Sequence, residues 1–452
     1  MRLSGSGQMG AGTSKIIKSE SLGGGNNYKL ILVFDLKTTK AQVPTLFLLV
    51  IVWLQTHSTI LQTCVRRHFR DYYYPDDNEN CYYDPDTTLS IPQLIEKYAG
   101  KVELHNVTTE DGYIITMFRI PNGNRKGVIL LHHSIATHSH IYLWQGNNSL
   151  ALTLWRDGFD VWLANQRGTI FSDKHVNMTK YDFAYWDFSV HEMGLYDVTS
   201  ELELIQSKTN GSQVIFFGHS LGSAIGLIYS ALKPIQASKY LKTMILLATP
   251  AYFEHGTSLV FLFIRLSSYI KAFMDLIHLG SPLILLPFII PVSRVFLRLF
   301  PFILFVVNVF VWQCCGYTPS ETDPTFFNYD GAIYADNFSW KTLAHFGQLA
   351  NARNRFQMYD YGEKENLKIY GQKIPPLYPL QNITVPTLLV SSYNDTLVSL
   401  KDCENLYQQL SPKAKVHGHW KISGLNHLDY HLGLHRKEIF VHELLEFLNN
   451  LK

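Results

Sequence analysis

Continuous runs of apolar residues recur along the chain from about residue 127 onward. They lie at Gly127–His132, Phe159–Leu163, Val214–Phe217, Thr243–Ala248 and Thr387–Val390. Runs of this kind are typical of strands that are buried on both faces of a sheet. Segments with helical periodicity separate them, for example Glu192–Lys208 and Ser223–Leu232. Buried strands that alternate with helices predict an α/β fold with a mostly parallel, doubly wound sheet.

The residues before the first of these runs show a different pattern. Ser90–Gly100 has the spacing of a short amphipathic helix, and Glu103–Pro121 shows β-branched alternation on both sides of Asp111-Gly112. An Asp-Gly pair between two alternating segments is a strong signal for a tight turn. We therefore expect a helix followed by a β-hairpin.

The alternation of strands and helices stops between about residues 249 and 345. Residues 259–312 are rich in Phe, Leu, Ile and Val, but charged residues and prolines interrupt them. A spanning helix needs about 20 consecutive apolar residues, which this region does not offer. We expect a helical cap at 249–345, inserted between two parts of the core at 90–248 and 346–452. A cap whose helices span a bilayer is the alternative.

The N-terminal region has the features of a targeting segment. Residues 1–41 are rich in Gly, Ser and Lys and predict a disordered extension. The run Val43–Leu54 contains about 12 mostly apolar residues between basic and polar flanks, a pattern typical of a signal peptide. We predict a signal peptide or signal anchor at 42–58, and a linker at 59–89. The expected location is secreted or lysosomal, with membrane anchoring through residues 43–54 as the alternative.

Sequons of the form Asn-x-Ser/Thr follow this segment and favour the secretory route. A further sequon at Asn394 lies in a candidate catalytic loop, so we expect no glycan there. The candidate glycosylation sites are Asn106, Asn147, Asn177, Asn210, Asn337 and Asn382.

Composition narrows the possible classes of function. Hydrophobic residues make up 46% of the chain and charged residues 17%, and the formal net charge is +2. Nucleic-acid binding is not expected, because it needs a concentrated basic face. The cysteines form no CxxC motif and no Cys/His cluster with zinc spacing, so we expect no structural metal. The alternative in which His132 and His133 are metal ligands is not favoured.

The most specific local motif is Gly-His-Ser-Leu-Gly at residues 218–222. It follows a predicted strand and precedes a predicted helix, which is the context of a nucleophile elbow. In such an elbow Ser220 lies at a helix N-terminus, where free N–H groups can stabilise an oxyanion. Ser220 is therefore the candidate nucleophile.

A nucleophilic serine of this type needs an acid and then a histidine later in the chain. Asp395 follows a strand-like segment, and His427 comes after one predicted helix and one predicted strand. The alternatives are Asp402 for the acid, and His417, His419 or His431 for the base. The oxyanion donors are expected to be the backbone N–H of Leu221 and one N–H near His133-Ser134.

A series of motifs, in a fixed order along the chain, resembles that of a known family. They are HNVTTEDGYIITMFRIP, LLHHS, GFDVWLANQRGTIFSDKH, YWDFSVHEMGLYD, FFGHSLGS, FQMYDYG, VPTLLVSSYNDTLV and NHLD. From about Ile91 to the C-terminus, the chain resembles the acid lipase family of α/β-hydrolases, which includes gastric and lysosomal acid lipases. The resemblance implies an α/β-hydrolase fold whose cap covers an apolar acyl site. It also implies Ser220 as nucleophile, Asp395 as acid, His427 as base, and the N–H groups of Leu221 and Ser134 as oxyanion donors.

The chain departs from the family pattern at three places. It has His-His-Ser at residues 132–134 where the family typically has His-Gly-Leu, and Asn-Gln-Arg-Gly-Thr at 165–169 where the family has Asn-x-Arg-Gly-Asn. Cys315 resembles one half of the family's cap disulfide, but no second cysteine lies a few residues before it.

The resulting hypothesis is a serine hydrolase that needs no cofactor. It would cleave carboxylic esters of apolar lipids, such as triacylglycerols or sterol esters, through an acyl-enzyme on Ser220. The expected partner is a neutral lipid ester at a lipid–water interface. The alternative is a non-catalytic lipid-binding protein on the same fold, motivated by the changed loop at 132–134. An epoxide or haloalkane hydrolase would carry an acid at the elbow, which Ser220 disfavours.

Overall fold

The computed structural model describes residues 89–282, 302–322 and 335–451, together with Thr63–Cys64, Cys81–Tyr82 and Asp86. All of them belong to one compact unit, residues 53–452. The predicted N-terminal extension at 1–41 and the predicted signal segment at 42–58 lie outside the described residues. Within the predicted linker, β1 (Thr63–Cys64) pairs antiparallel with β2 (Cys81–Tyr82), and Cys64 lies opposite Cys81 in the register.

The main sheet has the strand order β11-β10-β9-β8-β5-β6-β4-β3, and the two-residue β7 pairs with β4. Pairs from β11 to β6 are parallel, whereas β4 joins β6 and β3 antiparallel. This arrangement confirms the mostly parallel sheet and the hairpin at Asp111-Gly112. The strands are β3 (Glu103–Thr108), β4 (Tyr113–Ile120), β5 (Gly127–His132), β6 (Phe159–Ala164), β7 (Lys174–His175), β8 (Val214–His219), β9 (Leu241–Leu247), β10 (Thr387–Ser392) and β11 (His419–Ile422).

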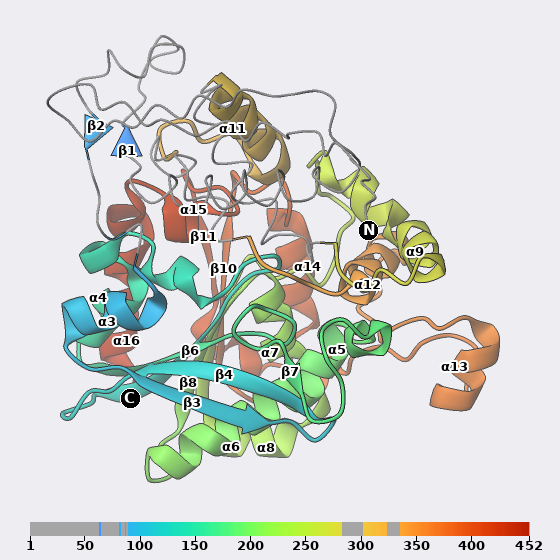
Figure 1. Ribbon diagram of the computed structural model, residues 1–452, viewed down its shortest axis with the longest axis horizontal. Coiled ribbons are helices and arrows are strands. Elements are labelled where there is room, and N and C mark those ends of the chain that lie inside the picture. The colour runs from blue at the N-terminus through green and yellow to red at the C-terminus, as the bar shows by residue number, and fades with distance from the viewer. Residues whose placement is uncertain are drawn as a thin grey trace, which may run out of the picture. The chain divides into compact units, whose positions relative to one another are not determined.

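Helices connect these strands and cover both faces of the sheet (Figure 1). They are α3 (Ile91–Ala99), α4 (Leu150–Arg156), α5 (Val190–Glu192), α6 (Val198–Lys208), α7 (Leu221–Leu232), α8 (Pro234–Tyr240), α9 (Val260–Leu276), α11 (Phe302–Cys315), α12 (Trp340–Asn351), α13 (Glu363–Tyr370), α14 (Leu400–Gln409), α15 (Asp429–Leu432) and α16 (His442–Asn450). Short 3₁₀ turns lie at Ser139–Leu143, Gly146–Asn148, Phe183–Trp186, Leu380–Asn382 and Ala414–His417, and π-helical turns at Met193–Asp197 and Lys437–Val441.

The central strand β5 illustrates how the apolar runs build two layers of core. Successive side chains of a strand point to opposite faces. Val128 and Leu130 pack in one cluster with α6 and α7, whereas Ile129 and Leu131 pack in another with α3, α4 and α16. Figure 1 shows these two groups of helices on opposite sides of the sheet. A strand that is apolar at every position therefore serves both layers, as its sequence predicted.

Helices α9 and α11 lie wholly within the predicted cap region. Helix α9 packs against α12, and the Ser267 hydroxyl of α9 donates a hydrogen bond to the Leu343 carbonyl at 3.0 Å. Helix α12 crosses the predicted boundary between residues 345 and 346. Residues 283–301 and 323–334 lie outside the described part of the chain, so the extent of the cap stays a prediction. No helix among the described residues is both long and apolar enough to cross a membrane.

Candidate active site

The sharp turn at Ser220 joins β8 directly to α7. Ser220 has φ 53° and ψ −118°, a conformation that is strained for a residue with a side chain. The flanking glycines make this turn possible. A Cβ on Gly218 would lie 2.6 Å from the backbone nitrogen of Ser223, and one on Gly222 would lie 2.3 Å from the carbonyl oxygen of His132. The predicted elbow therefore has a steric reason for each of its glycines.

Three candidate residues meet at the carboxyl edge of the sheet. His427 Nε2 lies 2.9 Å from Ser220 Oγ, and His427 Nδ1 lies 2.8 Å from Asp395 Oδ2. All three side chains are buried. Asp395 follows β10 and His427 follows β11, so the parallel sheet brings together residues that are about 200 positions apart in the chain. The geometry is a continuous hydrogen-bonded relay from serine to histidine to carboxylate.

The loop after β10 orients the carboxylate of Asp395. Its Oδ1 atom accepts hydrogen bonds from the N–H groups of Leu397 at 2.9 Å and Val398 at 2.8 Å. The Oδ2 atom is thereby directed toward His427. With two backbone donors on one oxygen, the carboxylate has one preferred orientation, which is a requirement for a group that aligns an imidazole.

The main chain of His427 is held by a neighbour of the serine. The Nε2 atom of His219 donates a hydrogen bond to the carbonyl oxygen of His427 at 2.9 Å. The His219 ring is fully buried, and burial lowers its pKa well below the usual value, so the ring is neutral. Sequence reasoning treated His219 only as the variable position of the elbow and missed this contact.

The alternative acid and bases lie in other environments. Asp402 accepts hydrogen bonds from the N–H groups of Glu254 and His255 and from the Ser399 hydroxyl at the start of α14. His419 contacts the Ser391 hydroxyl. The ring of His431 is buried against His219, and its two nitrogens have no hydrogen-bond partner within the described residues.

The expected oxyanion donors lie on the two loops nearest the elbow. Leu221 opens α7, and the first N–H groups of a helix have no partner within the helix. Ser134 follows the end of β5, two residues after His132. The roles of both N–H groups as oxyanion donors stay predictions.

The His133 side chain, at the position where the family has glycine, is accommodated inside the protein. Its Nε2 accepts the N–H of Gln166 at 3.1 Å, and its Nδ1 donates to the Ser134 carbonyl at 2.8 Å. The Gln166 side chain in turn donates to the His133 carbonyl at 2.6 Å. Burial lowers the pKa of His133 to about 3, so the ring is neutral and one tautomer satisfies both contacts. This bracing of the loop by Gln166 was not foreseen from the sequence.

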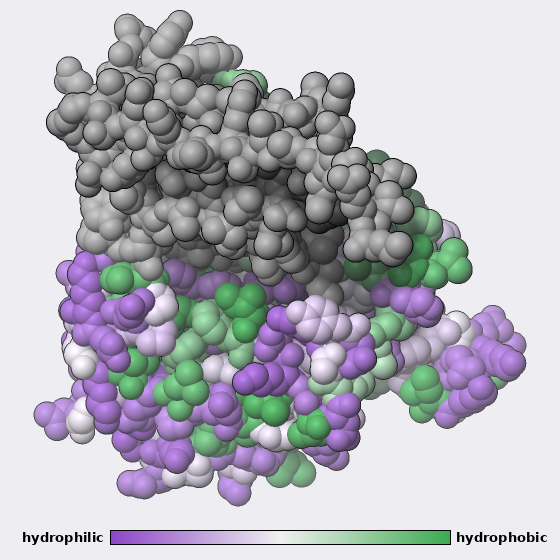
Figure 2. Space-filling view, viewed as in Figure 1, coloured by the Kyte–Doolittle hydropathy of each residue, from purple (hydrophilic) through white to green (hydrophobic). Residues whose placement is uncertain are grey.

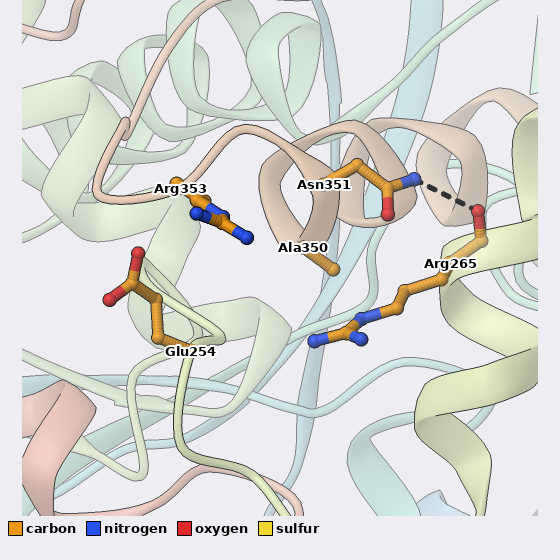
Figure 3. A pocket seen from close by; sticks show the side chains of 5 residues that line it. All are labelled: Glu254, Arg265, Ala350, Asn351 and Arg353. Atoms are coloured by element: carbon orange, nitrogen blue, oxygen red, sulfur yellow. Dashed lines mark hydrogen bonds between the residues drawn. The ribbon is translucent and has the colours of Figure 1, made fainter.

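No group of three or more His, Cys, Asp or Glu side chains within the described ranges could hold a metal ion. His132 instead pairs with Glu201 in the interior, with Nε2 and Oε2 2.6 Å apart. A pocket of about 520 Å³ lies elsewhere, at the junction of α9 and α12 (Figure 3). Glu254, Arg265 and Arg353 border it, and none of the Ser220, Asp395 and His427 side chains does.

The candidate glycosylation sites differ in exposure. Asn337 is half-buried, and its side-chain oxygen accepts a hydrogen bond from Ser281 at 3.2 Å. The exposed sites are Asn106, Asn147, Asn177, Asn210 and Asn382. Glycosylation at any of them stays a prediction. Asn394, for which no glycan was expected, is half-buried and accepts the Gly424 N–H at 2.8 Å.

Comparisons with known proteins find relatives of this chain among α/β-hydrolases and lipases. The family model described as "alpha/beta hydrolase fold" matches residues 127–267, and that of a "partial alpha/beta-hydrolase lipase region" matches residues 91–146. Gastric triacylglycerol lipase of Rattus norvegicus is 30% identical over 77% of this chain and 88% of its own length. Lipase member K of Homo sapiens is 28% identical over 83% of this chain and 96% of its own length.

Among solved structures, a soluble variant of monoglyceride lipase from Saccharomyces cerevisiae covers 82% of this chain and 98% of its own, with 14% identity and a TM-score of 0.48. The 30% identity to gastric triacylglycerol lipase over 77% of this chain, together with the match to the lipase region at residues 91–146, identifies the family. The chain belongs to the acid lipase family of α/β-hydrolases.

Proposed function

We propose that this protein is a serine hydrolase that cleaves carboxylic esters of apolar lipids through an acyl-enzyme on Ser220. The observation that carries the proposal is the relay in which His427 lies 2.9 Å from Ser220 Oγ and 2.8 Å from Asp395. A serine held in a strained elbow and hydrogen-bonded to a histidine that a carboxylate orients is the arrangement used for acyl transfer.

The reaction follows from the positions of these groups. His427 Nε2 takes the proton of Ser220 Oγ as the oxygen attacks the ester carbonyl carbon. The N–H groups of Leu221 and Ser134 donate hydrogen bonds to the resulting oxyanion, and Asp395 stabilises the imidazolium. The imidazolium then protonates the leaving alcohol. Water, deprotonated by His427, attacks the acyl-enzyme carbonyl carbon. The bond from that carbon to Ser220 Oγ then breaks, the imidazolium returns its proton to Oγ, and the carboxylic acid leaves.

The surface of α9 supports a lipid–water interface as the site of action. Exposed apolar side chains recur at helical spacing along one face of this helix, and Figure 2 shows hydrophobic residues gathered where α9 lies. Contiguous exposed apolar surface of this kind marks an interaction site. We refer to these residues as the α9 stripe: Leu262, Leu266, Tyr269, Phe273 and Leu276.

Triacylglycerols and sterol esters are the proposed substrates, since the relative from Rattus norvegicus is named a triacylglycerol lipase and both ester classes are apolar. The proposed location is outside the cell or in the lysosome, reached by the secretory route. The apolar run at residues 43–54 and the exposed sequons support it.

Covalent labelling with a fluorophosphonate tests the proposal. Purified wild-type protein and Ser220→Ala are compared, with circular dichroism confirming that both are folded. We expect labelling and ester turnover that require Ser220, measured on emulsified triacylglycerol and sterol ester. If folded wild-type protein neither reacts nor turns over ester, yet binds emulsified lipid, the chain is a lipid-binding protein and the proposed function is wrong.

A further inference from the structure

The segment that follows α11 contacts both loops of the catalytic relay. The carbonyl oxygen of Cys315, the last residue of α11, accepts the N–H of His427 at 3.1 Å and the N–H of Thr396 at 3.4 Å. Thr396 is the residue after Asp395. One carbonyl group therefore joins the loop that carries the proposed acid to the loop that carries the proposed base.

Gly316 allows this close approach. It has φ 121°, and a Cβ at this position would lie 1.8 Å from the carbonyl oxygen of Asn394. Its own carbonyl oxygen accepts a hydrogen bond from the Asn426 side chain at 3.2 Å. The turn after α11 is thus pressed against the two residues, Asn394 and Asn426, that immediately precede the proposed acid and the proposed base.

Thr318 completes the connection on the base side. Its hydroxyl accepts the Asn426 side-chain N–H at 2.7 Å and donates to Asp429 Oδ2 at 2.6 Å. The same Asp429 oxygen accepts the backbone N–H of Asn426 at 2.7 Å. Asn426 and Asp429 therefore close the short loop around His427, and Thr318 bonds to both of them. All three side chains are buried.

A second contact anchors the segment farther along. The carboxylate of Glu321 accepts the backbone N–H of His435 at 2.8 Å and lies 3.0 Å from its Nδ1, and the Leu434 N–H donates to the Glu321 carbonyl. We call residues 315–321 the clamp segment. It contacts the chain from Asn394 to Thr396 and from Asn426 to His435, on either side of the proposed relay.

Because this network is buried, losing any of its hydrogen bonds leaves a polar group without a partner and away from water. Burial raises the pKa of Asp429 to about 6, and the Thr318 hydroxyl opposes that rise by donating to the carboxylate. Removing the hydroxyl would leave a buried amide and a buried carboxylate each short of a partner. A loop that relaxes to recover those bonds would move His427 relative to both Ser220 and Asp395, and sub-ångström placement matters for proton transfer.

We propose that Thr318 is a positioning residue for the catalytic base, acting through Asn426 and Asp429, so that the clamp segment couples the end of α11 to the geometry of His427. The proposal rests on the proposed function, because it concerns the same base. It predicts that the relay is aligned only while this end of the cap is docked.

The test compares Thr318→Val, which keeps the shape and removes the hydroxyl, with Thr318→Ser, which restores it. Thr199→Val is the control, because Thr199 lies on α6, away from the relay, and its hydroxyl likewise both donates, to the Leu195 carbonyl, and accepts, from the Lys233 ammonium. The measurements are the rate of fluorophosphonate labelling, and kcat and KM on a soluble short-chain ester, normalised to the concentration of labelled sites. Normalisation removes any effect of a smaller folded fraction.

We expect Thr318→Val to lower kcat and the labelling rate about 10-fold or more with KM within about 2-fold, and Thr318→Ser to recover most of the loss. Thr199→Val should leave the normalised values unchanged. Wild-type rates in folded Thr318→Val would overturn the positioning role while leaving the proposed function intact. Absence of labelling in wild-type protein would instead refute the proposed function. If Thr318→Val does not fold, Thr318→Ala, which leaves room for a water molecule, is held to the same criteria.

Discussion

The side chain of His219 is hydrogen-bonded to the main chain of His427, with Nε2 of the first 2.9 Å from the carbonyl oxygen of the second. The residue that precedes the proposed nucleophile thus holds the backbone of the proposed base from one side. Cys315 holds it from the other side through the His427 N–H. The position of the imidazole is therefore fixed through the two peptide groups that flank the Cα atom of His427.

Removing the His219 donor should weaken this hold. In His219→Phe the aromatic ring remains but cannot donate to the His427 carbonyl. We expect the fluorophosphonate labelling rate to fall about 10-fold with little change in KM, since binding surfaces are unaffected. His431→Phe is the matched control, because the buried His431 ring packs on His219 and has no hydrogen-bond partner within the described residues. Equal rates in the two variants would contradict a role for the His219 contact.

Substitutions of two aspartates should separate a role in aligning the proposed base from a role in the stability of the fold. Asp395→Asn should reduce kcat by about 10³- to 10⁴-fold, because the amide cannot stabilise the imidazolium. Asp402→Asn should keep kcat within a few-fold and lower the free energy of unfolding by about 1 kcal/mol, because its carboxylate accepts the N–H groups of Glu254 and His255 and the hydroxyl of Ser399, the N-cap of α14. Kinetics and chemical denaturation of both variants check this. The reverse outcome would make Asp402 the acid.

The buried neutral ring of His133 should make stability depend on pH. Its pKa is about 3 in the folded protein and about 6.5 in an unfolded chain, so the unfolded state binds more protons between these values. The contribution of His133 to the free energy of unfolding is fully present above about pH 6.5 and decreases as the pH falls toward 3. Against His133→Asn, the wild type should lose about 2 kcal/mol of unfolding free energy between pH 7 and pH 5.

Denaturant unfolding at both pH values measures this difference. His442→Asn, on the exposed face of α16, serves as the control and should show no such change. If the unfolding free energies of the wild type and His133→Asn differ by the same amount at pH 7 and pH 5, His133 takes up a proton within the folded protein and the prediction is wrong.

The α9 stripe should matter for emulsions and not for dissolved substrate. Leu262→Ser combined with Phe273→Ser removes two exposed apolar side chains from it. We expect activity on emulsified triacylglycerol to fall at least several-fold, and kcat/KM on a soluble ester to stay unchanged, because less apolar surface remains to enter the interface. Ile235→Ser removes an exposed side chain from α8 instead and should affect neither assay. Equal losses on both substrates would refute interfacial docking by α9.

The sequence was most informative where one physical signal dominates. The apolar run Gly127–His132 coincides with β5, because a strand buried on both faces has no polar position to obscure its ends. The predicted strands that end at Phe217 and Val390 are each two residues shorter than the observed strands. β8 and β10 continue through polar residues that remain paired with neighbouring strands. Those extra residues carry the chain to Ser220 and toward Asp395.

Contacts between distant segments cannot be predicted from local patterns in the sequence. Glu192–Lys208 was predicted as one helix, but Met193–Asp197 is π-helical, and Asp197 contacts the buried Arg167 there, with Nε and Oδ1 2.9 Å apart. A π turn shifts the helical register, which periodicity alone does not reveal. The Thr318–Asp429 pair is likewise invisible, since nothing local to either residue indicates the other.

The backbone of Ser220 stores strain for as long as the protein stays folded. At φ 53° and ψ −118° a side chain costs of order 1–3 kcal/mol, and glycine would adopt the same conformation without that cost. Ser220→Gly should consequently be inactive and yet more resistant to unfolding than the wild type. The proposed nucleophile is thus poorly suited to its own backbone conformation, and a serine at this position makes the fold less stable than a glycine would.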